Sequence, residues 1–401
     1  MLIKNCSYVV TQNKERRILR DVDILIEDSV IKQIGPDLRG SPILDGTNKV
    51  FLPGLINTHT HIGMHLLRGI CDDEELDTWL EKVTNAEAKL SFEEIKHSAQ
   101  IAIQEMLTSG TTTFAEMYWP INPIIEAVRE SLIRAVLIPT YAQTLPHIQT
   151  NTERDFTNIQ EICKNIPRIT LGIGCHSVYS CSKEFITELK TIAKNNQILF
   201  AIHIAETRKE RVECLEKHKF LPIEFLESLN ILDAKTLLIH AIWITKSEIR
   251  TLAKHAAMIS HNPISNLKLA SGGVMPLPEM LEAGIVVGLG TDSVASNNSM
   301  DLFEEMKITG LIHKHHRWDP KTAPVQTILD MATINGARCL GLDHEIGSIE
   351  VGKKADIISI RLDKPQMQPL NNILSNIVYA INGGMITDVI VDGTLAIQKS
   401  Y

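Results

Sequence analysis

Short apolar runs alternate with amphipathic segments along most of this chain. Between about residues 50 and 342, eight apolar runs of strand length are mostly separated by segments with helical periodicity. One such segment begins at Ser91, which forms a capping-box pattern with Glu94, and stops at Gly110. This alternation is typical of a parallel sheet. The predicted strands span residues 50–56, 111–117, 134–140, 169–174, 198–204, 236–241, 256–260 and 285–290.

Eight strand–helix units over roughly 290 residues fit a TIM barrel better than an open doubly wound sheet. The two ends of the chain lack this pattern. Residues 1–54 and 343–401 carry short alternating runs separated by turn residues, which predict strands. We therefore expect an α/β protein in which a TIM (β/α)8 barrel, residues 55–342, carries a small β-sandwich formed by both chain ends.

The composition narrows the possible partners. With 44% apolar residues, 22% charged residues and a net charge of −8, the chain is typical of a globular protein without a nucleic-acid partner. No apolar stretch reaches the roughly 18 residues of a membrane span, and the N-terminus lacks a signal-peptide layout. Seven scattered cysteines without a CxxC pair argue against a disulfide framework, and the nearest pair, Cys175 and Cys181, is expected to fill the core. We expect a cytoplasmic protein that binds no membrane.

Polar side chains recur where the predicted strands end. His59 and His61 follow the first strand and, being two residues apart, can point to the same face. Any one of these residues alone would more often be structural. Because the carboxyl ends of barrel strands open onto one face, where active sites are built, we expect them to converge. The candidates are His59, His61, Glu116, His176, His203, Glu206, His240 and Asp292.

Three imidazoles and one carboxylate suit a borderline divalent ion. Zn²⁺ fits such a set best, and Fe²⁺ or Mn²⁺ also fits. An open coordination position would hold water, whose pKa falls from 15.7 to roughly 7 on zinc. Glu206, three residues after His203, can act as general acid or base without binding the metal itself.

These motifs resemble those of the amidohydrolase superfamily. The similarity runs from PGLINTHTH through HIAET and SHNPISNLKLASGG to LGTDSVASNNS, and the segments MATINGARCLG and IGSIEVGKKADI look like the family's closing elements. The pattern is most similar to the branch of 5′-methylthioadenosine/S-adenosylhomocysteine deaminases, with guanine deaminase and s-triazine hydrolases nearby. The resemblance implies a single metal ion held by His59, His61, His203 and Asp292.

The resemblance also implies catalytic roles. Asp292 would take a proton from the water, His240 would orient and polarise it, and Glu206 would deliver protons to the ring nitrogen and the leaving ammonia. Family members with two metals place a carbamylated lysine after the fourth strand. Here that strand reads ITLGIGCHS, without lysine, so one metal is expected.

Three further residues match substrate contacts of that branch. The resemblance implies that Glu87 binds the ribose hydroxyls and that His176 contacts the purine, while Trp79 matches a tryptophan that follows the first strand. The alternatives are helix packing for Trp79, a solvated helix face for Glu87 and a satisfied structural histidine for His176.

One departure from the branch concerns the substrate's 5′ end. Relatives that take S-adenosylhomocysteine show an arginine near the third strand, where this chain reads Leu-Ile-Pro-Thr at 137–140. Arg134 lies earlier on the strand and Arg154 in the following loop. Without a fixed guanidinium, carboxylate binding loses its best donor. We therefore expect a preference for neutral 5′-substituents over S-adenosylhomocysteine.

Other polar motifs carry weaker expectations. The His-Lys-His-His tract at 313–316 is expected to be a solvated helix end, and the acidic run at 72–75 a solvated loop over the site mouth. Ser296 would either bond to the catalytic carboxylate or cap a helix. Asn262 and Asn266 are expected to shape the loop after the seventh strand.

The predicted function is metal-dependent hydrolytic deamination of adenosine-type nucleosides (5′-methylthioadenosine, 5′-deoxyadenosine, adenosine), which gives the inosine analogue and ammonia. One alternative is hydrolysis at another heteroaromatic ring, such as guanine, a pterin or an s-triazine. Another is a non-catalytic scaffold of the same fold. A dinucleotide-dependent enzyme is disfavoured because no strand–GxGxxG–helix unit is present. A homo-oligomer is an expectation from the family alone.

Overall fold

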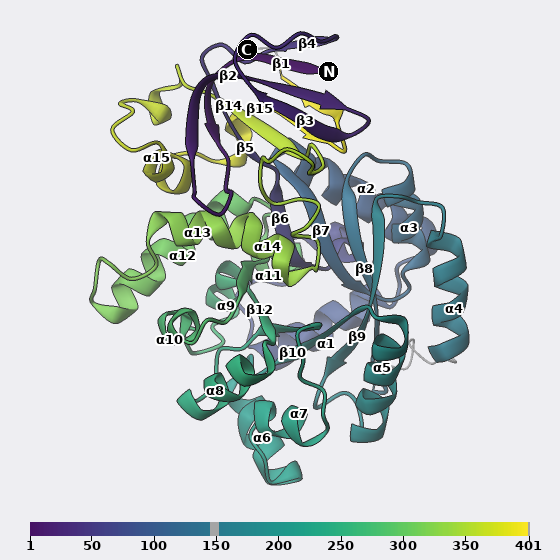
Figure 1. Cartoon of the computed structure of the whole chain (residues 1–401). Coiled ribbons are helices and arrows are strands. Elements are labelled where there is room, and N and C mark those ends of the chain that lie inside the picture. The colour runs from purple at the N-terminus through teal and green to yellow at the C-terminus, as the bar shows by residue number, and fades with distance from the viewer. Residues whose placement is uncertain (145–151, 400–401) are drawn as a thin grey trace.

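The computed structural model of the chain describes residues 1–144 and 152–399. Eight strands form a parallel sheet that curls into a barrel with helices around it, so the predicted TIM barrel is confirmed (Figure 1). In chain order and in space the strands are β6 (Leu55–Thr60), β7 (Thr111–Tyr118), β8 (Arg134–Tyr141), β9 (Ile169–Ser177), β10 (Leu199–Ile204), β11 (Thr236–His240), β12 (Met258–His261) and β13 (Val287–Leu289).

The last strand of the barrel returns to the first. The backbone N–H of Asp292, just after β13, donates to the carbonyl of His59 at 3.0 Å, and Thr60 pairs with Asp292 in a parallel bridge. The carboxyl end of β6 and the segment after β13 therefore lie against each other.

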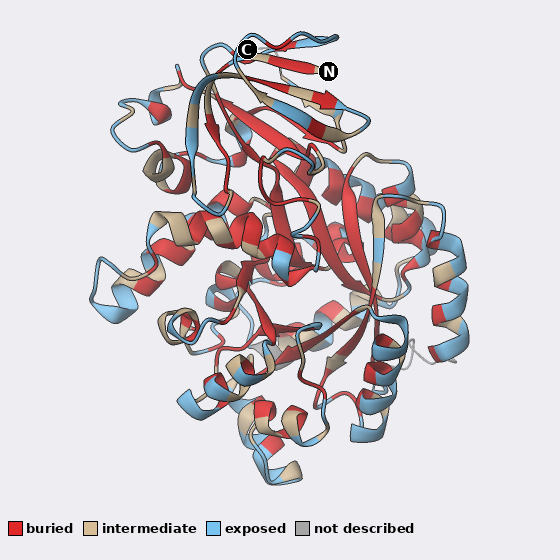
Figure 2. Ribbon diagram, viewed as in Figure 1, coloured by how far each residue is buried: buried red, intermediate tan, exposed pale blue. Residues whose placement is uncertain are grey.

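Amphipathic helices cover the outside of the barrel, with buried faces on the sheet and exposed faces outward (Figure 2). The predicted capping box is confirmed, since Ser91 and Glu94 bond reciprocally at the start of α2. The helices are α1 (Leu76–Glu87), α2 (Phe92–Thr108), α3 (Asn122–Arg129), α4 (Thr152–Cys163), α5 (Lys183–Asn196), α6 (Arg208–His218), α7 (Pro222–Ser228), α8 (Lys246–His255), α9 (Pro263–Lys268), α10 (Leu277–Glu282), α11 (Val294–Asn297), α12 (Leu302–Arg317), α13 (Val325–Ala332), α14 (Ile334–Cys339) and α15 (Ile373–Tyr379), with 3₁₀ turns η1 (Ile62–Leu67), η3 (Pro365–Met367) and η4 (Gly383–Met385). Within the described residues, none of these helices is long and apolar enough to cross a membrane.

Strands from the two chain ends form a second sheet. Its order is β16-β15-β14-β5-β1-β2-β3, with β4 beside β1, and β5 pairs antiparallel with β14 across more than 300 residues of sequence. A small β-sandwich built from both chain ends was expected, and both ends do come together, in one eight-stranded sheet. The domain boundaries at 54 and 342 stay a prediction. The strands are β1 (Leu2–Val10), β2 (Ile18–Glu27), β3 (Val30–Gly35), β4 (Ile43–Asp45), β5 (Lys49–Pro53), β14 (Ile357–Arg361), β15 (Ile386–Val391) and β16 (Thr394–Gln398).

The apolar run at 50–56, predicted as one strand, is two. β5 belongs to the terminal sheet and β6 to the barrel, and the chain changes sheet at Gly54. A side chain there has no room, because a Cβ on Gly54 would lie 2.1 Å from the Thr112 hydroxyl oxygen. The expectation was wrong here because both strands are buried, so hydrophobicity runs on without a break.

A buried ion pair joins the barrel to the terminal sheet. The Arg134 guanidinium, on β8, donates to the Asp356 carboxylate at 3.0 and 3.3 Å and to Asp392 at 3.3 Å. The Arg134 and Asp356 side chains are only 5% and 2% exposed. The role of Arg134 is therefore structural: it links the barrel to the terminal sheet.

We predict that Arg134→Met lowers the free energy of unfolding by about 3–5 kcal/mol, because it leaves the Asp356 carboxylate buried without its partner. Denaturant unfolding followed by tryptophan fluorescence measures this change. Lys164→Met, which removes an exposed pair with Glu161, is the control and should change stability by no more than about 0.5 kcal/mol. Equally small losses in both variants would contradict the structural role of Arg134.

Candidate metal centre and substrate pocket

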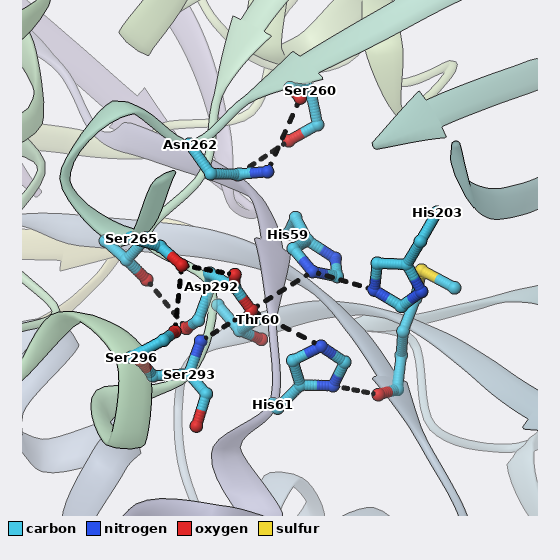
Figure 3. A network of polar contacts seen from close by, with 12 residues as sticks. His59, Thr60, His61, His203, Ser260, Asn262, Ser265, Asp292, Ser293 and Ser296 are labelled. Carbon is cyan, nitrogen blue, oxygen red and sulfur yellow. Dashed lines mark hydrogen bonds and ion pairs between the residues drawn. The ribbon is translucent and has the colours of Figure 1, made fainter. Parts of the chain in front are cut away.

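Four predicted side chains converge at the carboxyl end of the barrel (Figure 3). The Asp292 Oδ1 atom lies 3.5 Å from His59 Nε2 and 3.4 Å from His61 Nε2. His203 Nε2, from β10, lies 3.3 Å from His59 Nε2. Two triplets of ligand atoms, those of His59, His61 and Asp292 and those of His59, His203 and His240, each lie within 4.8 Å of one another.

The outer nitrogens of two of these imidazoles are held by backbone carbonyls. His61 Nδ1 lies 2.7 Å from the Met117 oxygen, and His203 Nδ1 lies 2.8 Å from the His176 oxygen. Since a carbonyl only accepts, each Nδ1 carries the hydrogen, and each Nε2 presents a lone pair to the cluster. This orientation is typical of metal-binding histidines. His59 Nδ1 is buried and has no partner among the described residues.

Burial sets the charge of the cluster. Desolvation lowers the pKa of His59 to about 4, although Asp292 opposes this shift. Burial alone would raise the pKa of Asp292, but the neighbouring His59, His240 and His61 hold it well below its usual range. Neutral imidazoles around one carboxylate form a donor set that fits a divalent cation.

Serine side chains and backbone orient the Asp292 carboxylate. The Ser293 N–H donates to Oδ1 at 2.8 Å, and the Ser265 hydroxyl donates to Oδ2 at 2.7 Å. Ser296 lies 2.9 Å from the Ser265 hydroxyl, so it reaches the carboxylate only through Ser265. The N-cap of α11 is Ser293. Neither expectation for Ser296 is therefore correct, and Ser265 was not anticipated.

Glu206 and His240 lie beside the cluster. Glu206 Oε2 is 3.7 Å from His240 Nε2, and burial raises the pKa of Glu206. A raised pKa is the direction of shift that favours a carboxyl group as a general acid. His240 ends β11 with a φ of 75°, a left-handed conformation that non-glycine residues adopt infrequently.

Two asparagines contact His240 rather than only shaping a loop. Asn266 Nδ2 lies 3.0 Å from His240 Nδ1, and Asn262 Nδ2 lies 3.3 Å from the same atom. Asn262 follows β12 directly, in the position where several other strands carry His or Asp, whereas Asn266 lies in α9. The strand-end position is the signal by which sequence reasoning could have found Asn262.

A pocket opens over the cluster, and α1 forms one of its walls. Trp79 and Glu87 line it from α1, and His176 lines it from the end of β9. Trp79 also packs in the core, so its two interpretations are compatible. Glu87 is half-buried, and desolvation raises its pKa to about 7, which does not fit a solvated helix face. His176 Nδ1 lies 3.0 Å from the Ser180 hydroxyl.

The pocket wall carries no cationic side chain in the part of the chain that the structure describes. Its lining residues include neither arginine nor lysine. Arg134 points to the terminal sheet instead. Arg154, which was expected in a loop, lies in the first turn of α4 and is not among the residues that line the pocket.

The remaining expectations have mixed outcomes. His315 and His316 are exposed as predicted, but His313 is fully buried and its Nε2 lies 3.1 Å from His261 Nε2. The tract is the last turn of α12, and its helical turn points His313 inward. Residues 72–75 are exposed as expected.

All seven cysteines are buried and free.

Glu116 lies inside β7 and does not join the cluster. Its carboxylate accepts from the Thr60 hydroxyl at 2.5 Å and from the Ile62 N–H at 2.9 Å. Burial raises its pKa to about 8. Glu116 therefore holds the turn that follows the two histidines of β6.

Known proteins are similar to this chain over nearly its whole length. The model of the amidohydrolase family matches residues 50–396. A 5′-deoxyadenosine deaminase from Methanosphaera stadtmanae is 39% identical over 96% of this chain and 92% of its own length. A 5-methylthioadenosine/S-adenosylhomocysteine deaminase from Thermococcus onnurineus is 38% identical over 98% of this chain and 93% of its own.

Solved structures show the same fold. An adenosine deaminase from Xanthomonas campestris with bound zinc superposes with a TM-score of 0.95 at 29% identity, over 99% of this chain and 92% of that one. A zinc-complexed atrazine chlorohydrolase from Arthrobacter aurescens gives a TM-score of 0.90 at 25% identity, over 99% and 95%. These zinc-bound neighbours and the His–Asp cluster together support a divalent metal at this site. The chain belongs to the amidohydrolase family.

Proposed function

We propose that this protein is a hydrolytic deaminase of adenosine-type nucleosides. The reaction forms a C6–O bond on the purine, breaks the C6–N bond to the exocyclic amino group, and releases the inosine analogue and ammonia. The observation that carries this proposal is one pocket whose lining includes the His–Asp cluster, the half-buried acid Glu206 and, on the α1 wall, Glu87. The relatives named as 5′-deoxyadenosine and 5-methylthioadenosine/S-adenosylhomocysteine deaminases support the substrate class.

In this proposal His59, His61, His203 and Asp292 hold one divalent ion, and zinc is the simplest choice. When bound, such an ion lowers the pKa of water and so makes a nucleophile available near neutral pH. The strand β9, which reads ITLGIGCHS, contains no lysine that could bridge a second ion.

Two carboxyl groups act as base and acid, and their pKa values are shifted in opposite directions from the ordinary values. Asp292, with a low pKa, accepts a proton from the attacking water. Glu206, with a raised pKa, gives a proton to the ring nitrogen and then to the leaving amine. His240 holds the oxygen nucleophile in line with C6.

The other end of the pocket recognises the nucleoside. Glu87 accepts hydrogen bonds from the ribose hydroxyls, His176 contacts the purine, and Trp79 closes the apolar wall between them. The absence of Arg and Lys from the described lining favours a neutral 5′-substituent, because a carboxylate would be desolvated there without a partner. A cytoplasmic location and a homo-oligomer stay predictions.

We predict that the protein binds one divalent ion per chain and that His203→Ala loses it. The variant keeps only two of the three proposed imidazole ligands and therefore binds the ion more weakly, so the ion should be lost during dialysis. Elemental analysis by mass spectrometry measures the stoichiometry. His255→Ala, which changes a histidine paired with Glu227 on the outer surface, should keep the ion. Two ions per chain in the wild type would contradict a mononuclear site.

We predict a higher kcat/KM for 5′-methylthioadenosine and 5′-deoxyadenosine than for S-adenosylhomocysteine, by about tenfold or more, since a charged-group hydrogen bond is worth about 1.5–3 kcal/mol. An ammonia-release assay with the zinc-loaded protein measures this. A 5′-thioether of adenosine with a neutral chain as long as homocysteine separates charge from size and should react well. Equal or faster turnover of S-adenosylhomocysteine would refute the preference, and inactivity on every adenosine derivative would refute the function.

We predict that Glu87→Gln lowers kcat/KM for nucleosides by about 10- to 100-fold, because an amide is a weaker acceptor for ribose hydroxyls than a carboxylate. Activity on a free base or a triazine should not change. Glu81→Gln, on an exposed position of the same helix, is the matched control. A loss with Glu87→Gln that is the same for ring substrates without ribose would show that Glu87 acts on the fold instead.

A further inference from the structure

We infer that Asn262 and Asn266 are positioning residues that keep the proton of the neutral His240 imidazole on Nε2. The inference deepens the proposed function, on which its catalytic consequence rests. It concerns a choice that the cluster leaves open: His240 either adds a fourth imidazole ligand or donates a hydrogen bond at the reaction centre. The three atoms offered by His59, His203 and His240 lie within 4.8 Å of one another, so distance alone allows both roles.

The contacts of His240 Nδ1 decide between them. Asn262 Nδ2 and Asn266 Nδ2 approach this atom at 3.3 and 3.0 Å. An amide NH₂ group donates and does not accept, and a neutral imidazole carries one hydrogen on one of its two nitrogens. With two donors aimed at Nδ1, this atom accepts, and the hydrogen is on Nε2.

The orientation of the Asn262 amide follows from Ser260. Asn262 Nδ2 lies 3.5 Å from the Ser260 backbone oxygen, and Asn262 Oδ1 accepts from the Ser260 hydroxyl at 3.2 Å (Figure 3). The rotated amide would set its oxygen against the backbone oxygen, and two acceptors repel. Asn262 therefore presents its NH₂ group to His240.

Asn266 adds a second contact of the same kind. Its Nδ2 also lies 3.5 Å from Glu206 Oε1, so one amide faces both His240 and the proposed acid. Asn262 is fully buried, Asn266 is 6% exposed and His240 is 2% exposed. Water therefore has little access to Nδ1, and the two amides are the donors that it meets among the described residues.

This tautomer determines what His240 can do. Its Nε2 lies 3.7 Å from Glu206 Oε2, on the side of the cluster. A protonated nitrogen has no lone pair for a metal, so His240 is left to donate a hydrogen bond to the oxygen nucleophile. In the opposite tautomer, Nε2 would offer a lone pair to the ion and would compete with water for the open position.

The primary test is the tautomer in the wild-type protein. In the zinc-loaded enzyme labelled with ¹⁵N-histidine, ¹⁵N chemical shifts distinguish protonated from bare ring nitrogens, and the His240 signals are those missing from His240→Gln. We expect a bare Nδ1 and a protonated Nε2. A protonated Nδ1 with a bare Nε2 would overturn the inference, whether or not the protein deaminates nucleosides.

A variant tests the role of the asparagines. Asn266→Asp replaces the donor by a carboxylate of the same shape, which only accepts, so Nδ1 should become protonated. We expect kcat to fall by about 100-fold with KM changed less than about threefold, since a wrong tautomer removes proton handling rather than binding. Asn376→Asp, a half-buried asparagine of α15 that donates to the Met367 oxygen, controls for the substitution itself.

Two results separate this inference from the proposed function. A variant with unchanged Nδ1 and unchanged kcat would overturn the role of Asn266. Failure of the wild type to release ammonia from any adenosine derivative would refute the proposed substrate, but the wild-type ¹⁵N shifts would still decide the tautomer. Asn266→Ala, which leaves Asn262 as the only donor, supplies a folded alternative if the aspartate variant is unstable, and a mixture of tautomers is expected in it.

Discussion

The closure of the barrel between β13 and β6 is the constraint on which the site depends. One backbone hydrogen bond, from Asp292 N–H to the His59 carbonyl at 3.0 Å, fixes the residue after the last strand against the end of the first. This contact fixes the backbone at Asp292 relative to the backbone at His59. The Asp292 carboxylate is therefore held beside the His59 and His61 imidazoles. Asp292 adopts a φ of 62° to do so, a conformation that aspartate tolerates better than most residues.

Burial then gives the assembled side chains their chemistry. The same desolvation has opposite consequences for bases and acids: it lowers the pKa of His59 to about 4, and it raises the pKa of Glu206. Asp292 escapes this rise because imidazoles surround its carboxylate. One pocket therefore contains lone pairs for a cation, a carboxylate whose pKa is lowered and a carboxyl group whose pKa is raised. Separate pKa values for two acids in one pocket are what acid–base chemistry at neutral pH requires.

Sequence reasoning succeeded where a property is local. Strand ends and their polar residues are local, so the convergence of His59, His203 and Asp292 could be predicted from barrel geometry. The contact of Asn266 with His240 depends on where α9 lies relative to the end of β11, which no sequence spacing reports.

The errors have the same origin. At Gly54 the chain passes from one sheet to another while both strands stay buried, so the hydrophobic pattern contains no boundary. At His313 the charged neighbours in the sequence predicted an exposed side chain. The side chain is buried because it lies on the inward face of α12. In both cases the packing of a distant element, and not the local pattern, determined the outcome.

In the proposed function the chemistry lies on the barrel strands, whereas recognition is shared between α1 and His176 at the end of β9. The cation donors and the acid follow barrel strands, whereas Trp79 and Glu87 lie on α1, which is not part of the strand register. A change in α1 can therefore alter the ring or sugar that fits without moving the cluster. An adenosine deaminase and an atrazine chlorohydrolase share this fold at TM-scores of 0.95 and 0.90, so the fold alone does not determine the substrate. In the present chain, the proposed preference for a neutral 5′-substituent rests on that wall, because its described lining residues include neither Arg nor Lys.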